Sequence, residues 1–162
     1  MASSSSSSRQ LKHQVFLSFG VEDTGHNFTS HLREALKGKG LDVFFDEEKL
    51  EKGEQLSEAL SKAIAASNIS VIILSVNYAS SESCLAELSK IMDRKRTEGQ
   101  IALPIFYHVD PSDVRNLGGS FKTSFDEHES KWADELVRRW KDAFAEVGTL
   151  KGWHIEGGIF DR

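Results

Sequence analysis

The sequence has a single cysteine, Cys84, and no apolar run that approaches the roughly 18 residues needed to span a bilayer. One cysteine excludes an internal disulfide framework and fits a reducing compartment. Positive charge is not in excess, because 20 Lys and Arg residues face 25 Asp and Glu residues for a net charge of −5. Bulk charge therefore does not favour non-specific binding to nucleic acid. We expect neither a membrane nor a nucleic acid as partner.

Standard motifs of phosphate and metal chemistry are also missing. No G-x-G-x-x-G follows the first predicted strand, and no G-x-x-x-x-G-K-[ST] occurs anywhere in the chain. The 6 histidines show no paired spacing with cysteine or carboxylate that suits zinc. We expect no metal and no cofactor.

The length of 162 residues and the 39% hydrophobic content are typical of one globular domain. The Ser-rich segment 1–12 cannot bury enough surface to offset the entropy of ordering, so a disordered tail is predicted there. The ordered domain is predicted over 13–155, with a C-terminal tail over 156–162.

Short apolar runs alternate with segments whose apolar residues recur at helical spacing. The predicted strands are 15–19, 41–45, 69–74, 101–107 and 152–155, and the predicted helices are 28–36, 56–64, 85–97 and one long stretch from Asp110 to Val147. Pro104 predicts a bulge or an unpaired position in the fourth strand. This alternation predicts an α/β, flavodoxin-like fold, with a five-stranded parallel sheet in the order 2-1-3-4-5 and helices on both faces. The final helix of such a fold is missing from the prediction.

Ligands of an open parallel sheet bind beyond the carboxyl ends of its strands, where the strand order reverses. Here that crevice is predicted between the first and third strands, beside the loops 20–25 and 75–84. Glu87 follows Cys84 by three residues, so the two share a helix face near the helix start. Two interpretations stay open for Glu87: a first-turn carboxylate favoured by the helix dipole, or a functional group. Cys84 by itself is typical of a small buried hydrophobe.

Several blocks of the chain resemble plant Toll/interleukin-1 receptor (TIR) domains, in the right order and over roughly His13 to Ile155. The blocks are Val15–Phe19 with Glu22–Thr24, Phe28–Leu32, Asn77–Ser81, Cys84–Leu88, Pro104–Arg115, Gly119–Phe121 and Gly152–His154.

The resemblance implies that Glu87 is the catalytic residue of an activity that cleaves NAD to nicotinamide and ADP-ribose or a cyclic variant. NAD is then the substrate and not a cofactor. The substrate-binding residues that it implies are Phe19, Gly20, Val21, Ser83 and Cys84. It also implies weak association with other TIR domains through Ser30 and His31, and defence signalling in the cytoplasm, with the nucleus as a second compartment.

The chain departs from the family pattern at three positions near the predicted crevice. Gly20 and Gly25 stand where the family has arginines, and Ser83 stands where it has a tryptophan. Glycine supplies no charge for phosphates, and serine offers no ring for stacking. Two hypotheses therefore remain: an NAD glycohydrolase, or a catalytically weak or inactive adaptor or decoy that acts by pairing with TIR domains.

Overall fold

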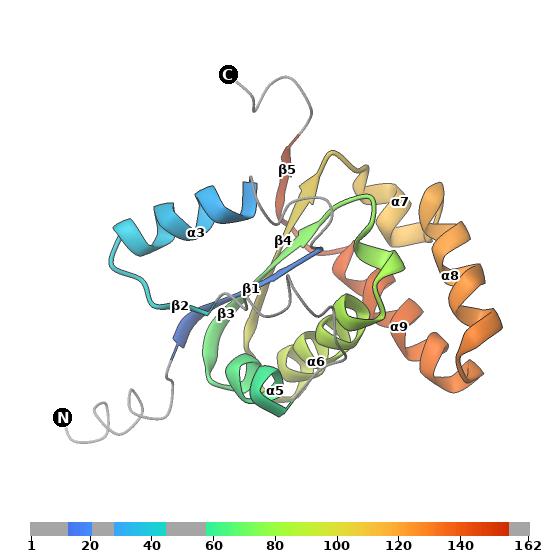
Figure 1. Ribbon diagram of the computed structural model, residues 1–162, viewed down its shortest axis with the longest axis horizontal. Coiled ribbons are helices and arrows are strands. Elements are labelled where there is room, and N and C mark those ends of the chain that lie inside the picture. Colours follow the sequence, from blue (N-terminus) through green and yellow to red (C-terminus); the bar gives the residue numbers. More distant parts are fainter. Residues whose placement is uncertain (1–12, 21–27, 45–57, 156–162) are drawn as a thin grey trace.

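The computed structural model describes residues 13–20, 28–44 and 58–155. Within them five parallel strands form one sheet in the order β2-β1-β3-β4-β5 (Figure 1). The strands are β1 (His13–Phe19), β2 (Val43–Phe44), β3 (Ser67–Leu74), β4 (Ile101–Tyr107) and β5 (Trp153–Ile155). The predicted flavodoxin-like order 2-1-3-4-5 is confirmed.

The helices lie on both faces of this sheet, as predicted. They are α3 (Phe28–Gly38), α5 (Glu58–Ala65), the 3₁₀ helix η1 (Tyr78–Ser80), α6 (Glu82–Glu98), α7 (Pro111–Asn116), α8 (Ser120–Lys131) and α9 (Asp134–Val147). Among the described helices, α3 lies on one side of the sheet, and α5, α6 and α9 lie on the other (Figure 1). We call these two sides the α3 face and the α6 face.

Alternating residues of the strands supply the two cores. Phe16, Ile72 and Leu74 pack in the core of the α6 face, whereas Leu17 and Val71 pack in the core of the α3 face. Because both faces are covered, the central strands are apolar almost throughout instead of alternating with polar residues.

Helix α6 begins three residues earlier and ends one residue later than the predicted 85–97. Ser81 caps the helix, with its side chain accepting a hydrogen bond from the backbone N–H of Cys84 at 3.2 Å. Gly99 ends the helix in the left-handed region, with φ of 72°, and its N–H donates to the carbonyl of Lys95.

The predicted single helical stretch from Asp110 to Val147 is wrong, because three helices occupy it. Asp110 caps α7 as expected, and its side chain accepts from the N–H of Ser112 at 2.9 Å. The chain then breaks again at Trp132, whose extended backbone (φ −121°, ψ 160°) ends α8 before α9 begins. The apolar stripe through Trp132 and Trp140 continues across this break, so its spacing could not reveal it.

One further strand prediction needs correction, and the prediction for Pro104 holds in one of its two forms. The second strand is shorter than predicted: only two residues, Val43 and Phe44, pair with β1, and Phe45 lies outside the described residues. Of the two alternatives predicted for Pro104, the bulge is absent, because the pairing of β4 with β3 runs without a shift through Pro104, and the unpaired position is found on the β5 side. Pairing with β5 begins one residue later, at Ile105. Proline has no backbone N–H to donate, and at Pro104 no partner in β5 requires one. Gly152 lies beside Pro104 instead, so close that a Cβ added to Gly152 would lie only 2.0 Å from the carbonyl oxygen of Pro104.

Candidate functional site

The carboxyl ends of β1 and β3 meet where the strand order reverses, and there the structure brings several predicted residues together. Gly20 follows β1, and a Cβ at this position would lie 3.6 Å from the hydroxyl of Ser75, which follows β3. Cys84, on the first turn of α6, donates its thiol hydrogen to the carbonyl of Phe19 at 3.3 Å. The predicted crevice is therefore the place where β1, β3 and α6 converge.

Glu87 lies in the second turn of α6 and is almost completely buried, with 1% of its surface exposed. The hydroxyl of Ser18, on β1, donates to Oε1 of Glu87 at 2.8 Å. The interpretation of Glu87 as a first-turn carboxylate is wrong, because Glu87 lies one turn further along the helix and is buried. A buried charge is costly unless it is hydrogen-bonded, so this contact is part of what lets the carboxylate lie there.

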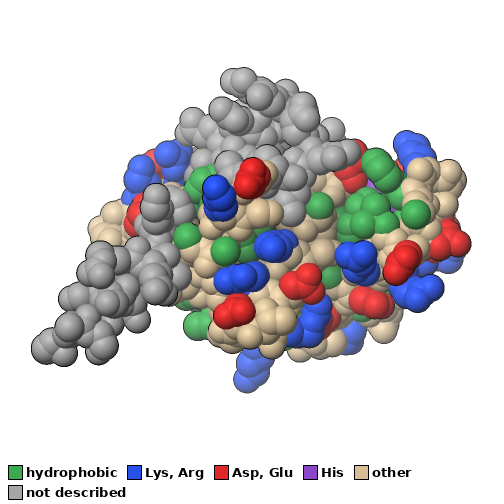
Figure 2. Space-filling view, turned by 90° about the horizontal axis from the view of Figure 1, so that it is seen from below, with side chains coloured by type: hydrophobic (Ala, Val, Ile, Leu, Met, Phe, Trp, Pro, Cys, Tyr) green, Lys and Arg blue, Asp and Glu red, His purple; other side chains and the backbone are tan. Residues whose placement is uncertain are grey.

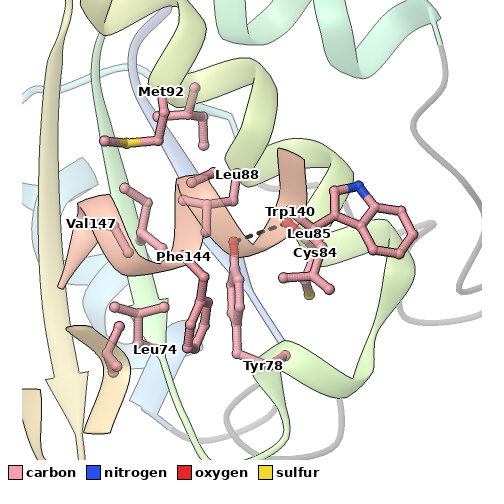
Figure 3. Close-up of a cluster of buried hydrophobic side chains, with 14 of the residues drawn as sticks. Leu74, Tyr78, Cys84, Leu85, Leu88, Met92, Trp140, Phe144 and Val147 are labelled. Carbon is pink, nitrogen blue, oxygen red and sulfur yellow. Dashed lines mark hydrogen bonds between the residues drawn. The ribbon is translucent and has the colours of Figure 1, made fainter. Parts of the chain in front are cut away.

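Tyr78, on η1, belongs to the same cluster and is completely buried. Its hydroxyl lies 2.8 Å from Ser18 Oγ and donates to the carbonyl of Cys84 at 3.2 Å. Figure 3 shows the ring of Tyr78 pointing along the buried core toward the start of α6, with its hydroxyl directed at this carbonyl. Burial raises the pKa of Tyr78 well above its ordinary value of 10.0, and the nearby Cys84 and Glu87 raise it further, against a lowering by the hydrogen bond with Ser18.

Sequence reasoning missed Ser18 and Tyr78 as site residues. A signal for Ser18 was present, because it is the one polar residue in the apolar run Val15–Phe19. It points to the α6 face together with Phe16, and it is completely buried. Tyr78 carries no comparable signal, since a buried tyrosine is common in any core.

The remaining predicted residues divide between buried, exposed and undescribed positions. Ser83 is 2% exposed, so a larger side chain there needs its neighbours to move. Val21 and Gly25 lie outside the described residues. Ser30 is half-buried and His31 is exposed, and both lie on α3, across the sheet from Glu87.

A hollow lies at the opposite, amino-terminal edge of the sheet. It has a volume of about 640 Å³ and is lined by Ala65, Ser67, Asn68, Arg94, Glu98, Gly99, Gln100 and Ile101. The side-chain amide of Gln100 donates to the carbonyls of Ala65 and Ser67 in the lining of this hollow, at 3.0 and 2.7 Å. This hollow lacks the buried carboxylate that distinguishes the carboxyl edge.

On the face shown in Figure 2, Lys and Arg side chains are interspersed with Asp and Glu side chains. Within the described ranges, no group of three or more His, Cys, Asp or Glu side chains is placed to hold a metal ion. No described helix combines the length and the apolar character required to cross a membrane.

The sheet order and the buried carboxylate at the reversal point define a flavodoxin-like α/β domain with a candidate site at its carboxyl edge. A model of the TIR domain family matches residues 12–158. The chain belongs to the TIR domain family.

Relatives and solved structures agree with this assignment. The chain is 49% identical to the TMV resistance protein N of Nicotiana glutinosa over 94% of its own length, and 48% identical to the disease resistance protein RPV1 of Vitis rotundifolia over 95%. These stretches are 13% and 11% of the two relatives, so the chain spans about an eighth of their length. The TIR domains of the activated Roq1 resistosome, which directly recognizes the pathogen effector XopQ, superpose with a TM-score of 0.84 and 38% identity, covering 93% of this chain and 92% of that one.

Proposed function

We propose that this TIR domain cleaves NAD⁺ to nicotinamide and ADP-ribose or a cyclic variant, with Glu87 as the catalytic residue. The observation that carries the proposal is the carboxylate of Glu87, held at the carboxyl edge of the sheet where β1 and β3 diverge. The relatives named as disease resistance proteins support a role in plant defence signalling. We place that role in the cytoplasm, with the nucleus as a second compartment.

The chemistry suits a single carboxylate. Nicotinamide is already a cationic leaving group, so cleavage of its glycosidic bond leaves positive charge on the ribose. A fixed negative charge beside the ribose stabilises that charge as it develops. Phe19, Gly20, Val21, Ser83 and Cys84 are the proposed substrate-binding residues, because those that are described lie where β1 meets α6.

Access to Glu87 sets a condition on this activity. With 1% of Glu87 exposed, its carboxylate reaches a ribose only after neighbouring groups move. We infer that association of TIR domains favours this rearrangement, with Ser30 and His31 in the contact. The similarity to TIR domains of an activated resistosome supports association as the trigger.

A second candidate function is an adaptor or decoy that acts by TIR–TIR pairing without turnover. Two observations favour it. Glu87 is buried and hydrogen-bonded in this structure, and Gly20 offers no cation for a phosphate.

Release of nicotinamide from NAD⁺ by concentrated protein separates the two functions. We expect turnover by the wild-type chain and a loss of about 100-fold or more in Glu87→Gln, in line with the usual contribution of a catalytic carboxylate. Glu82→Gln is the matched control, since Glu82 is a partly exposed carboxylate on the first turn of the same helix. Equal turnover in wild type and Glu87→Gln removes Glu87 from the mechanism, and no turnover in either favours the adaptor.

A further inference from the structure

A continuous chain of buried oxygens leads away from Glu87. Oε1 of Glu87 lies 2.8 Å from Ser18 Oγ, Ser18 Oγ lies 2.8 Å from Tyr78 Oη, and Tyr78 Oη lies 3.2 Å from the carbonyl of Cys84. The chain crosses from α6 to β1, then to η1, and returns to α6. Ser18 and Tyr78 are completely buried, and Glu87 nearly so. Its two hydroxyl groups can each turn to donate in either direction.

When Glu87 is ionised, every proton of the chain points toward it. Ser18 donates to the carboxylate, and Tyr78 turns its single proton from the carbonyl of Cys84 to Ser18 Oγ. A hydrogen bond from a neutral donor to a buried carboxylate favours the charged form. This arrangement therefore lowers the cost of keeping the negative charge inside the protein.

When Glu87 is protonated, the same atoms accept the opposite arrangement. Glu87 donates to Ser18 Oγ, Ser18 donates to Tyr78 Oη, and Tyr78 donates to the carbonyl of Cys84. Tyr78 regains the hydrogen bond to the carbonyl of Cys84 that it gives up in the ionised state, and no heavy atom has to move. An apolar residue at position 18 would support neither state, because Oε1 would lose its partner.

We propose that Ser18 and Tyr78 are positioning residues that hold Glu87 in one place in both of its protonation states and set its affinity for the proton. The proposal rests on the proposed function for its use. During hydrolysis the bond between C1′ and nicotinamide breaks with its electron pair on nitrogen, while the oxygen of water bonds to C1′. The proton released by that water passes to Glu87, so the carboxylate begins ionised and ends protonated.

Tyr78, Cys84 and His128 are the titratable groups that the described residues place in or beside the cluster of Glu87. Tyr78 on η1 and Cys84 on α6 are the described groups whose charge couples within this cluster. His128 on α8 reaches η1 through the carbonyl of Ala79, at 2.8 Å. The residues that α5, α9 and β4 bury in this core are apolar: Leu60, Ala63, Ile64, Ala102, Phe106, Val137, Trp140, Ala143, Phe144 and Val147. The hydroxyl groups of Ser18 and Tyr78 are thus one means by which the described residues influence Glu87.

The test measures the titration of Glu87 itself, so it does not depend on turnover. Protein labelled with ¹³C at the glutamate side-chain carboxyl is titrated by NMR, and the Glu87 signal is identified by its loss in Glu87→Gln. We expect Ser18→Ala to raise the midpoint by about one to two pH units, because the charged form loses its donor. Tyr78→Phe, which keeps the ring in place, raises it by less, and Ser18→Thr restores the hydroxyl and the wild-type midpoint.

Ser70→Ala is the matched control, because Ser70 is a buried strand serine of the α6 face at the level of Phe16. A midpoint in Ser18→Ala equal to that in Ser70→Ala overturns the proposal. If the wild type releases nicotinamide, the acid limb of its pH–rate profile moves upward in Ser18→Ala and not in Ser70→Ala. A shifted midpoint without any turnover refutes the proposed enzyme but supports the hydroxyl chain, whereas turnover with an unshifted midpoint does the reverse.

Discussion

The two faces of the sheet differ in how completely they are covered. On the α6 face, α5, α6 and α9 bury a large core in which Phe144 and Leu88 are completely excluded from water. On the α3 face, α3 is the one described helix, and Ile101 and Trp153 at the far strands are 55% and 63% exposed. The alternation of the strands places both on this side with Leu103 and Ile155.

This difference separates stability from association. Because hydrophobic stabilisation grows with the apolar area removed from water, the described α6 face supplies most of it, and it also fixes the candidate site. The α3 face carries Ser30 and His31, the proposed contact with other TIR domains. In a domain built in this way, an effect of pairing on Glu87 has to cross the sheet from the α3 face to the α6 face.

The largest expected difference is in the free energy of unfolding. Phe144→Ala should lower it by about 3–5 kcal/mol, because the ring packs edge-on against Phe121 and Phe125 at 4.9 and 5.4 Å and its loss leaves a cavity. Trp153→Ala should lower it by about 1 kcal/mol or less, since most of that side chain is in water. Denaturant titration of both variants measures the two values, and similar losses would show that the faces contribute equally.

A smaller effect is expected on NAD binding at the edge between the faces. Gly20→Arg should tighten it by about 1.5–3 kcal/mol, the contribution of one charge-assisted contact, and Gly25→Arg should add to this gain. At Gly20 the added Cβ meets Ser75 and Tyr78 at ordinary contact distances of 3.6 Å, so this arginine can be tested alone. Gly38→Arg on α3 is the control, with open space around it. Calorimetry that finds unchanged affinity places position 20 away from the dinucleotide.

The buried hydroxyl of Tyr78 should make the free energy of unfolding depend on pH in the alkaline range. The pKa of Tyr78 is raised by folding, so above about pH 10 the unfolded chain loses this proton while the folded chain keeps it. Stability therefore falls as the pH rises from there, by at most about 1.4 kcal/mol per pH unit for one proton. In Tyr78→Phe this part of the slope should vanish, as measured by urea unfolding at pH values from about 8.5 to 11. If the free energy of unfolding falls equally with pH in the wild type and in Tyr78→Phe, Tyr78 is not the source of the loss.

The smallest effect on stability is expected on α3. Ser30→Ala/His31→Ala should change the free energy of unfolding by less than about 0.5 kcal/mol, because His31 is exposed and Ser30 is half-buried. The wild type should be a monomer at micromolar concentration, with weak pairing at higher concentration that the double variant loses. Light scattering during chromatography measures this, with Glu34→Ala/Lys37→Ala on the same helix as control. A stable dimer that ignores Ser30 and His31 would show that another surface drives assembly.

Local patterns were sufficient to predict most elements of the fold. The β-branched run of β3 and the helical spacing of the apolar residues in α6 gave these elements from neighbouring residues alone. The break at Trp132 was not predictable, because an apolar stripe continues through it and only the backbone angles show it. Periodicity reports which side of a segment is buried and not whether the segment is one helix or two.

The site was predictable only where spacing within one helix defined it. Cys84 and Glu87 share a face of α6, as expected, and both reach the end of β1. Ser18 was missed because its contacts join residues 60 and 69 positions apart, at Tyr78 and Glu87. Such contacts follow from how β1, η1 and α6 pack, and no local pattern encodes the distance between them.

The thiol of Cys84 can be used to measure how often the candidate site opens. It is the one cysteine of the chain, it is 1% exposed, and it lies three residues before Glu87 on the same helix face. A thiol reagent can reach it only while the edge between β1 and α6 is open, so the labelling rate at saturating reagent equals the rate of opening. The labelling rate of Cys84 in the wild-type protein therefore measures how often the carboxylate of Glu87 becomes exposed to solvent. Its dependence on protein concentration shows whether pairing of TIR domains makes this opening faster.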